Sequence, residues 1–537
     1  MVILMVVELE ISEEYKSLSP AEFFYRNKEI TGFSNPVRAM YQTVRELVEN
    51  ALDATDVYGI LPSIKIIISR CKDQPTHYTI TVEDNGIGVP PQYAPQAFGQ
   101  VLFSSKYKLR QSRGRFGLGA KMAILYGQLT TGKPVEVITS TIASKYVYYF
   151  KIMIDIVSNT PIVMEKASWL KKWNWHGTIV SVTIEGDWGR ARSRIIEYIK
   201  RTSIVTPYAE IAFIDPDGRY YYFPRSTEKI PRPPKEVLPH PQGIDVEYMK
   251  MLIKSTKAEN LYEFLVQTFQ GVGKTTAGQF FKETGLNPNL NPKDLSLSEV
   301  EDLVQKLKSF KGFKSPRSDA LSPIGEDLIE LGLKNIFNPE FATAVTRKPS
   351  VYEGHPFVVE VGIAYGGTIQ LASTPILLRY ANKIPLLYDE KADVTWKILE
   401  NFDWKYYGVD FPAPLVVLVH ICSTKVPYKG VGKESIAEVP EIEREILNGL
   451  REVARRLKIF LAKKRKEEEA RRKLITFIKY LPEISRCLAT LSMNPETGEK
   501  TVPETEIMNK LLEILKRKLN LAEASEGVVK KIVVGIE

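Results

Sequence analysis

Residues Glu46–Ala54 read ELVENALDA, and this short stretch decides the fold. Asn35 can cap a helix that carries Pro36 in its first turn, and Gly59 can end it. Three polar residues of this helix, Glu46, Asn50 and Asp53, are spaced at i, i+4 and i+7 and therefore share one face, with apolar residues roughly opposite. By itself this spacing indicates only a solvated polar stripe on an amphipathic helix.

A second motif, Asp84–Gly88 (DNGIG), follows a segment with strand periodicity. The sharp turn leaves the Asp84 carboxylate at the strand end, beside a backbone that a ligand can approach closely. A simple turn between two strands has a similar sequence.

A third motif, GRFGLGAK, places three glycines ahead of a predicted helix that runs through Leu125. Backbone N–H groups and a helix N-terminus can hold phosphate oxygens, and glycine permits the close approach. The residues of this loop are predicted to bind nucleotide: Gly114, Arg115, Phe116, Gly117, Leu118, Gly119, Ala120 and Lys121. A glycine-rich loop alone is not specific.

In order and spacing the three motifs resemble the N box and the two glycine boxes of the GHKL superfamily, which includes gyrase, heat-shock chaperones, histidine kinases and MutL. Gly177-Thr178, at the entry to a predicted strand, is similar to the fourth box of that superfamily. The resemblance implies a Bergerat-type α/β sandwich that binds and hydrolyses ATP. No histidine stands in a helical dimerisation segment ahead of this region, which argues against a histidine kinase.

The resemblance also implies roles for single residues. Asn50 would hold Mg²⁺ against the phosphates, and Asp84 would accept a hydrogen bond from the adenine amino group with Thr178 nearby. Glu46 would be the general base that activates water. The remaining predicted nucleotide contacts are Asp53, Gly88, Ser105 and Lys106; alternatively, Lys106 belongs to an exposed basic loop with Lys108 and Arg110.

Composition and periodicity divide the chain into four regions, and the resemblance implies which domains the first and third of them are. Residues 1–230 are predicted to form the GHKL ATPase domain, and the proline-rich stretch Ile230–Gly243 to be a linker. Residues 231–311 are predicted to form a small all-helical domain, and residues 312–470 an α/β transducer domain. A long amphipathic helix is predicted from about Pro440 to Tyr480. Residues 471–537 would hold the end of that helix and a helical tail.

Gly271–Thr276 (GVGKTT) looks like the end of a Walker A loop, yet Thr268 stands where the first glycine is required. The surrounding stretch, Phe264–Phe281, instead resembles a helix-hairpin-helix or helix-two-turn-helix element. Whether its glycine-rich turn contacts DNA phosphate or is purely structural stays open.

Three further segments make the resemblance more specific: Ser17–Asn27 (SLSPAEFFYRN), Arg379–Asp389 (RYANKIPLLYD) and Ser423–Glu438 (STKVPYKGVGKESIAE). They resemble the B subunits of the topoisomerase VI family, the type IIB DNA topoisomerases. The resemblance implies an A2B2 heterotetramer in which the A subunit of topoisomerase VI cleaves double-stranded DNA. ATP would drive B–B homodimerisation and close a gate around a transported duplex.

In type II topoisomerases a transducer lysine reaches the γ-phosphate. Lys433 is the preferred candidate because Gly432 frees the backbone there and a helix is predicted to open at Glu434. Lys425 and Lys429 are the competitors.

The net charge of +9 is a mild basic bias that suits a polyanionic partner without demanding one. No apolar run is long enough to span a membrane, and three dispersed cysteines indicate neither disulfides nor zinc, which fits a cytoplasmic protein. Lys463–Lys473 is a basic run that either lines a DNA cavity or forms a salt-bridged face, because Glu467–Glu469 interrupt it. The rival function is that of a mismatch-repair or chaperone-type GHKL ATPase.

Overall fold

The computed structural model describes residues 17–114, 117–430, 432–494, 496, 498 and 501–518, without the side chains of 515–518. Two predicted nucleotide contacts, Arg115 and Phe116, and the last part of the predicted tail lie outside the described residues. The chain divides into two compact units. One holds the residues up to Asp403 together with Phe411–Val453, and the other holds Trp404–Asp410 together with the residues from Ala454 onward.

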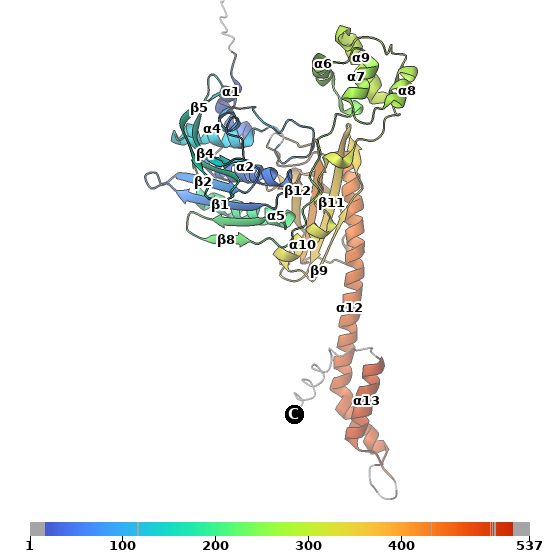
Figure 1. Ribbon diagram of the computed structural model, residues 1–537. Helices are drawn as coiled ribbons and strands as arrows, with labels where there is room; N and C mark the ends of the chain where they lie inside the picture. The colour runs from blue at the N-terminus through green and yellow to red at the C-terminus, as the bar shows by residue number, and fades with distance from the viewer. Residues whose placement is uncertain are drawn as a thin grey trace, which may run out of the picture. The chain divides into compact units, whose positions relative to one another are not determined.

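The first unit contains an eight-stranded sheet in the order β5-β4-β3-β6-β2-β1-β7-β8 (Figure 1). Its strands are β1 (Ser63–Arg70), β2 (His77–Asp84), β3 (Val135–Ser140), β4 (Tyr146–Asp155), β5 (Thr160–Leu170), β6 (Gly177–Glu185), β7 (Glu210–Ile214) and β8 (Tyr220–Phe223). Helix α2 (Pro36–Asp56) packs on β2 and β6, α4 (Gly119–Thr131) packs on β6, and α5 (Trp188–Val205) packs on α2. The predicted α/β sandwich is confirmed.

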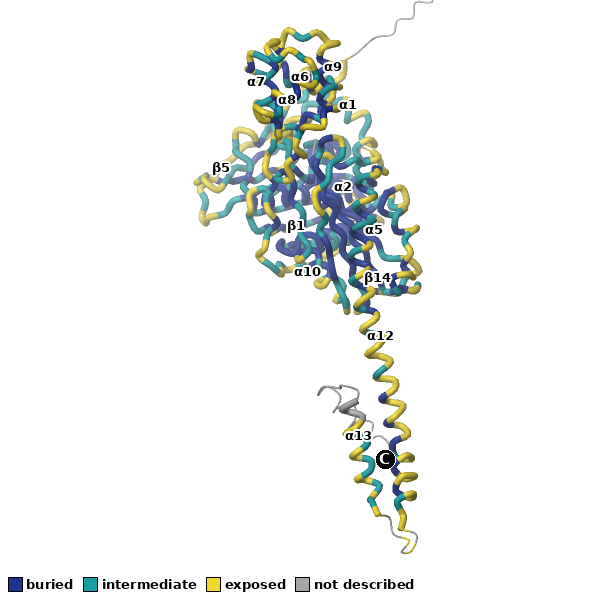
Figure 2. The backbone as a smooth tube through the Cα atoms, turned by 90° about the vertical axis from the view of Figure 1, so that its right-hand side faces the viewer, coloured by how far each residue is buried: buried dark blue, intermediate teal, exposed yellow. Residues whose placement is uncertain are grey.

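Helix α2 starts as the sequence predicts. The side chain of Asn35 accepts a hydrogen bond from the backbone N–H of Arg38, and Pro36 occupies the first turn. Its polar face is not solvated, however, because Glu46 is 7% and Asp53 8% exposed. Figure 2 shows α2 as a buried element within the first unit.

Strands β2 and β6 pair antiparallel, with Asp84 directly opposite Thr178. Because paired residues in a sheet point to the same face, this register brings two residues 94 positions apart in the chain onto one surface.

The predicted helical segment contains α6 (Val246–Ser255), α7 (Leu261–Thr268), α8 (Lys274–Thr284) and α9 (Leu297–Ser309), packed around their own apolar core. The first three residues of the GVGKTT stretch lie in the turn between α7 and α8, where Gly271 has a φ of 75°, and the last three begin α8. No strand lies ahead of it among the described residues of this segment, so the predicted pair of helices joined by a turn is confirmed, as is the exclusion of a Walker A loop.

A second sheet has six strands in the order β10-β11-β14-β12-β13, with β9 paired to β11. The strands are β9 (Phe341–Thr346), β10 (Ser350–Tyr352), β11 (His355–Tyr365), β12 (Ile376–Ala381), β13 (Ile384–Pro385) and β14 (Leu415–Ser423). Helix α10 (Glu326–Phe337) packs on β9 and β11, and α11 (Val394–Glu400) lies between β13 and β14 in the chain.

No helix opens at Glu434, where the sequence predicts one, and the long helix α12 (Pro440–Leu491) begins where its amphipathic pattern predicts. Other acceptors use the backbone donors of the intervening residues: Ile436 donates to Asp393 Oδ2, and Ala437 donates to the carbonyl oxygen of Pro427. The segment is therefore a loop, closed by a bridge between Tyr428 and Ile436.

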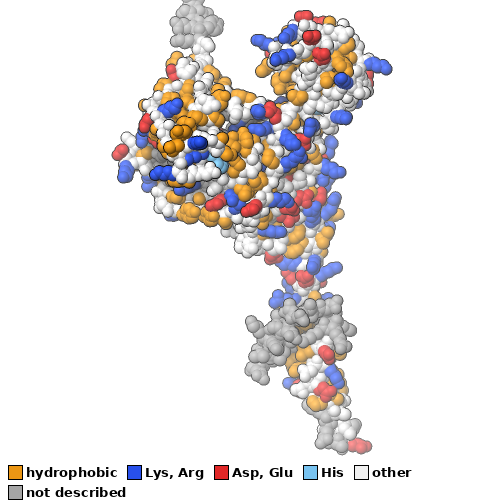
Figure 3. Space-filling model, viewed as in Figure 1, with side chains coloured by type: hydrophobic (Ala, Val, Ile, Leu, Met, Phe, Trp, Pro, Cys, Tyr) orange, Lys and Arg blue, Asp and Glu red, His pale blue; other side chains and the backbone are white. Residues whose placement is uncertain are grey.

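The second unit contains α12 from Ala454 onward, α13 (Glu504–Lys518) and the short segment Trp404–Asp410. Arg465 donates to the carbonyl oxygen of Gly408 at 2.8 Å, and the Lys458 ammonium lies 4.1 Å from the ring centre of Tyr406. Basic and acidic side chains intermingle along the visible part of α12 (Figure 3). Among the helices of the described residues, none has the length and hydropathy needed to cross a bilayer.

Candidate functional site

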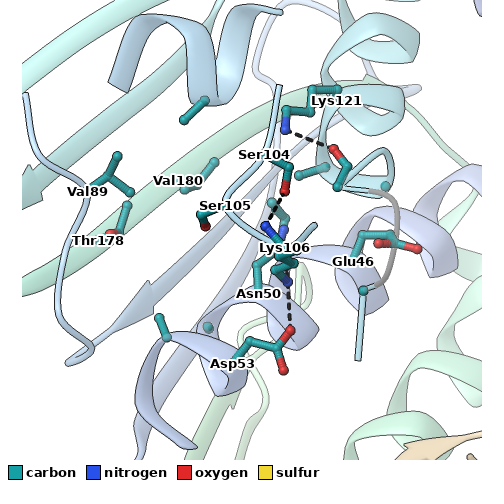
Figure 4. A pocket seen from close by; sticks show the side chains of 18 of the residues that line it. Glu46, Asn50, Asp53, Val89, Ser104, Ser105, Lys106, Lys121, Thr178 and Val180 are labelled. Atoms are coloured by element: carbon teal, nitrogen blue, oxygen red, sulfur yellow. Dashed lines mark hydrogen bonds and ion pairs between the residues drawn. The ribbon is translucent and has the colours of Figure 1, made fainter. Parts of the chain in front are cut away.

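A cavity of about 630 Å³ opens in the first unit, between α2, the glycine-rich loop and the ends of β2 and β6. The structure brings nearly all of the predicted nucleotide contacts to its wall: Glu46, Asn50, Asp53, Asp84, Gly88, Ser105, Lys106, Gly114, Gly117, Leu118, Gly119, Ala120, Lys121, Thr178 and Lys433. In Figure 4, Val89, Thr178 and Val180 lie on one side of the cavity and the charged residues on the other. The cavity thus has an apolar end and a charged end.

At the apolar end, Asp84 is the buried polar group. Its Oδ1 accepts hydrogen bonds from the backbone N–H of Gly86 at 2.8 Å and of Thr178 at 3.2 Å. Burial raises the pKa of Asp84 to about 7, although these two hydrogen bonds oppose the shift. A carboxylate here is costly to leave without a donor, so the site suits a ligand that brings an N–H group.

Gly88 explains why the DNGIG turn needs its last glycine. Its φ of 72° is in the left-handed region, and an added Cβ would overlap the carbonyl oxygen of Ser140. The turn therefore lies directly against the end of β3.

At the charged end, the Lys106 ammonium is 2.7 Å from Asn50 Oδ1 and 2.7 Å from Asp53 Oδ2 (Figure 4). Burial alone would raise the pKa of Asp53, but Lys106 and Arg113 together lower it. The alternative that Lys106 is a loop lysine exposed with its basic neighbours is wrong, because its side chain is only 20% exposed and bonded inside the cavity.

Asn50 Oδ1 and Asp53 Oδ2 are also candidate ligands for a metal ion. Amide and carboxylate oxygens are hard ligands that suit Mg²⁺, which typically takes one or two protein oxygens together with substrate phosphates. Asn50 Oδ1 and Asp53 Oδ2 already converge on one positive charge at bonding distance, so the donor set fits such an ion. Among the described residues no cluster of three His, Cys, Asp or Glu side chains offers a site made by protein alone.

Glu46 lies on α2 one turn before Asn50, and Gln42 donates to its Oε1 at 3.2 Å. The carboxylate touches the backbone at Gly119, where an added Cβ would overlap it. Gly119 is the first residue of α4, whose N-terminus has no side-chain cap. A carboxylate and a set of backbone N–H donors therefore face the same space.

Lys121 connects two loops of the cavity wall. Its ammonium donates to the carbonyl oxygens of Phe103 at 2.6 Å and Gly117 at 2.8 Å. Burial, with Lys106 nearby, lowers the pKa of Lys121 to about 8. Lys121 thus ties the loop that carries Ser105 and Lys106 to the glycine-rich loop.

Of the three candidate lysines after β14, Lys433 lines the cavity. Lys425 instead pairs with Glu353 at 3.5 Å, and Lys429 pairs with Glu438 at 3.1 Å. Lys433 has a φ of 54°, which makes this a defined turn although no helix follows directly.

Sequence reasoning missed several residues of the site. Gln42 precedes Glu46 by one helical turn, so helix spacing could have found it. Arg113 stands just before the glycine-rich loop and binds Asp53 Oδ1 at 3.3 Å. Phe98 and Val89 also line the cavity, and no motif marks them.

Two family models match the chain. The model described as "Histidine kinase-, DNA gyrase B-, and HSP90-like ATPase" matches residues 35–146, and the model described as "Topoisomerase VI B subunit, transducer" matches residues 316–473.

Curated relatives match over almost the full length. The B subunit of type 2 DNA topoisomerase 6 from Saccharolobus shibatae is 55% identical over 522 residues, which are 96% of this chain and 98% of that protein. The proteins of the same name from Saccharolobus islandicus and Saccharolobus solfataricus are each 54% identical, again over 96% of this chain and 98% of theirs.

Proposed function

The chain belongs to the family of the B subunits of type 2 DNA topoisomerase 6, and on that premise we propose that it is the ATP-binding and ATP-hydrolysing subunit of a type II DNA topoisomerase. In this role, ATP binding gates the passage of one duplex through a transient double-strand break in another. The observation that carries the proposal is the cavity itself, in which Glu46 and Asn50 on α2, Asp84 at the end of β2 and Lys433 after β14 converge from three separate parts of the chain.

The two ends of the cavity suit the two ends of ATP. Adenine would lie at the apolar end, where Asp84 Oδ2 accepts from its amino group while Oδ1 keeps the backbone donors of Gly86 and Thr178. The phosphates would lie against the N-terminus of α4, with Ser105, Lys106 and Lys121 as further donors. The roles of Arg115 and Phe116 stay predictions.

Hydrolysis needs a positioned water and a base. Glu46, oriented by Gln42, would accept a proton from the water that attacks the γ-phosphorus, and the bond to the β–γ bridging oxygen breaks to release ADP and phosphate. Lys433 would stabilise the charge that develops on the γ-phosphate oxygens.

Mg²⁺ bound at Asn50, with Asp53 beside it, would supply charge neutralisation for the phosphates. For this to happen the Lys106 ammonium must leave Asn50, and the γ-phosphate is the anion it would then contact. On nucleotide binding, the Lys106 ammonium would therefore leave Asn50 and contact the γ-phosphate.

We further infer that the chain assembles with the A subunit of topoisomerase VI into an A2B2 heterotetramer on double-stranded DNA, and that ATP drives B–B homodimerisation. The relatives' shared name, which designates a B subunit of a DNA topoisomerase, supports a second kind of subunit as partner and DNA as substrate. The domain boundaries at residues 230, 311 and 470 and the cytoplasmic location stay predictions. DNA contact by the α7–α8 turn or by Lys463–Lys473 stays open.

The test is co-purification of the full chain from its native organism. Stable association with a tyrosine-bearing protein that cleaves DNA, and ATP-dependent decatenation of linked DNA circles by the complex, are the expected results. ATP turnover without such a partner would favour the mismatch-repair or chaperone alternative and overturn the proposal. If the complex decatenates equally well without ATP, the gating role is wrong.

A further inference from the structure

The segment Gln111–Arg113, directly before the glycine-rich loop, is held by the part of the chain that carries the second sheet. The Gln111 side chain accepts from the backbone N–H of Ser322 at 2.6 Å and donates to its carbonyl oxygen at 3.3 Å. Asn382 donates to the carbonyl oxygen of Ser112 at 3.2 Å. One end of the nucleotide loop is therefore bonded to residues more than 200 positions away.

Lys383 follows Asn382 in the two-residue turn between β12 and β13. Both residues have positive φ, 48° and 67°, which identifies a turn that Asn and Gly favour and that a long side chain occupies at a cost. Lysine is also among the residues least often buried, yet the Lys383 side chain is only 5% exposed. A lysine side chain buried at this turn implies that its ammonium group makes a specific contact there.

That ammonium group points into a line of alternating charges. It lies 3.5 Å from Asp56 Oδ2 and donates to Ser322 Oγ at 3.0 Å. The same Asp56 oxygen accepts from Arg113 at 2.8 Å and from the Tyr208 hydroxyl at 3.0 Å. Burial lowers the pKa of Lys383, with Asp56 opposing this shift.

The line continues into the nucleotide cavity. Arg113 bridges the two carboxylates on α2, because its NH1 group donates to Asp53 Oδ1 at 3.3 Å. Asp53 Oδ2 in turn holds Lys106. Burial opposes the charge of Arg113, but Asp56 and Asp53 raise its pKa. The signs alternate from Lys383 through Asp56, Arg113 and Asp53 to Lys106.

We propose that Lys383 is a positioning residue for the nucleotide site: through Asp56 and Arg113 it sets how firmly Asp53 holds Lys106. The inference rests on the proposed function, because it concerns the same ATP pocket. Lys383 does not touch nucleotide in this arrangement. It gives the second sheet a connection to the pocket that is separate from Lys433.

The direction of the effect follows from the shared oxygen of Asp56. Without the Lys383 ammonium, Asp56 attracts the Arg113 guanidinium group more strongly. The Arg113–Asp53 contact, which is longer than the Arg113–Asp56 contact, is then weakened. Asp53 then relies on Lys106 alone and releases it less readily to the phosphates. Nucleotide affinity should fall as a result.

The experiment is a titration of the full chain with a fluorescent, non-hydrolysable ATP analogue. Lys383→Met should weaken binding about tenfold, within the usual range of coupling between sites, whereas Lys383→Arg should stay within about threefold of the parent chain because it keeps the charge. The matched control is Lys391→Met, which removes an exposed lysine eight residues on and should leave affinity unchanged.

Two further variants test the route. In an Asp53→Asn background, Lys383→Met should have no added effect, because the connection is already broken at the pocket. Tyr208→Phe removes only one donor to Asp56 and should weaken binding about threefold. Tyr208→Phe replaces Lys383→Met as the test of the proposal if Lys383→Met fails to fold.

The outcomes separate the two claims. If Lys383→Met lowers only the unfolding temperature and leaves affinity unchanged, or if its full effect persists with Asp53→Asn, the inference is overturned. If the parent chain itself binds no analogue, the proposed function fails, and the inference falls with it.

Discussion

The guanidinium group of Arg45 lies 3.7 Å from the carboxylate of Glu434, the residue that follows Lys433. Arg45 immediately precedes Glu46 on α2 and also binds Glu49 at 2.7 Å. The helix that carries the predicted base therefore holds the loop that carries the predicted γ-phosphate lysine. Burial raises the pKa of Glu434, while Arg45 favours its charged form.

Glu434→Gln should slow ATP turnover about tenfold, because Lys433 is no longer held at a fixed distance from the phosphate. Nucleotide affinity should change little, since the adenine end is untouched. Steady-state kinetics with a parallel binding titration measure both. Glu438→Gln, an exposed residue of the same loop, is the control, and an equal loss in that variant would contradict the positioning role.

Lys433→Ala should lower ATP turnover and strand passage by about two to three orders of magnitude, which is roughly what removal of one transition-state donor costs. ATP-driven dimerisation should be retained through the other contacts, and light scattering with an ATP analogue measures it. Lys425→Ala and Lys429→Ala are matched controls, because both lysines pair outside the cavity. The assignment is wrong if Lys425→Ala reproduces the loss and Lys433→Ala does not.

Glu46→Gln should abolish nearly all turnover, by about a thousandfold, because the amide cannot accept the proton from water. The chain should still bind nucleotide, since Gln keeps the shape of the side chain. A phosphate-release assay and an equilibrium titration on one preparation distinguish these effects. Residual turnover near the parental rate would remove Glu46 as the base.

Gly119→Ala should act on the same carboxylate from the other side. Its methyl group overlaps Glu46, so turnover should fall about a hundredfold through misplacement of the base. Gly278→Ala, where a Cβ meets open space on α8, is the control and should leave turnover unchanged. Parental activity in Gly119→Ala would show that Glu46 has another productive position.

Nucleotide affinity should rise with pH through about 7, because the Asp84 carboxylate accepts from adenine only when ionised. In the chain without nucleotide, the same titration should change the stability of the fold in the opposite direction. The pKa of Asp84 lies above its ordinary value of 3.8, so the folded state binds more protons between these values, and the contribution of Asp84 to the free energy of unfolding falls as pH rises through about 7. Titrations at pH 6 and pH 8 check the first effect, and Asp84→Asn should flatten it.

The sequence predicts well what local spacing controls. The cap at Asn35, the DNGIG turn and the strand that precedes it all lie where periodicity and turn residues predict them. The helix predicted to open at Glu434 was wrong because long-range acceptors take the donors of Ile436 and Ala437, whereas the predicted start of the long helix near Pro440 is confirmed. Strand β5 was missed because its exposed residues follow no clean alternation.

The charged contacts behind the pocket could not be predicted. Asp56 follows Asp53 by three residues on α2, but its partner Lys383 comes from the second sheet. Nothing in the spacing of either residue indicates the other, because only the packing of the two parts brings them together. The resemblance to a family likewise points to motif residues and not to the residues that hold them.

The pairing of Asp84 with Thr178 has a consequence for how this chain can change over time. Side chains alternate between the faces of a sheet, so a single-residue insertion or deletion within β2 or β6 would turn Asp84 or Thr178 away from the cavity. Length variation should therefore be tolerated in surface turns, such as 157–159 and 171–174, while these two strands keep a constant length. The proposed recognition of adenine would in this sense depend on the number of residues in each strand as much as on their chemistry.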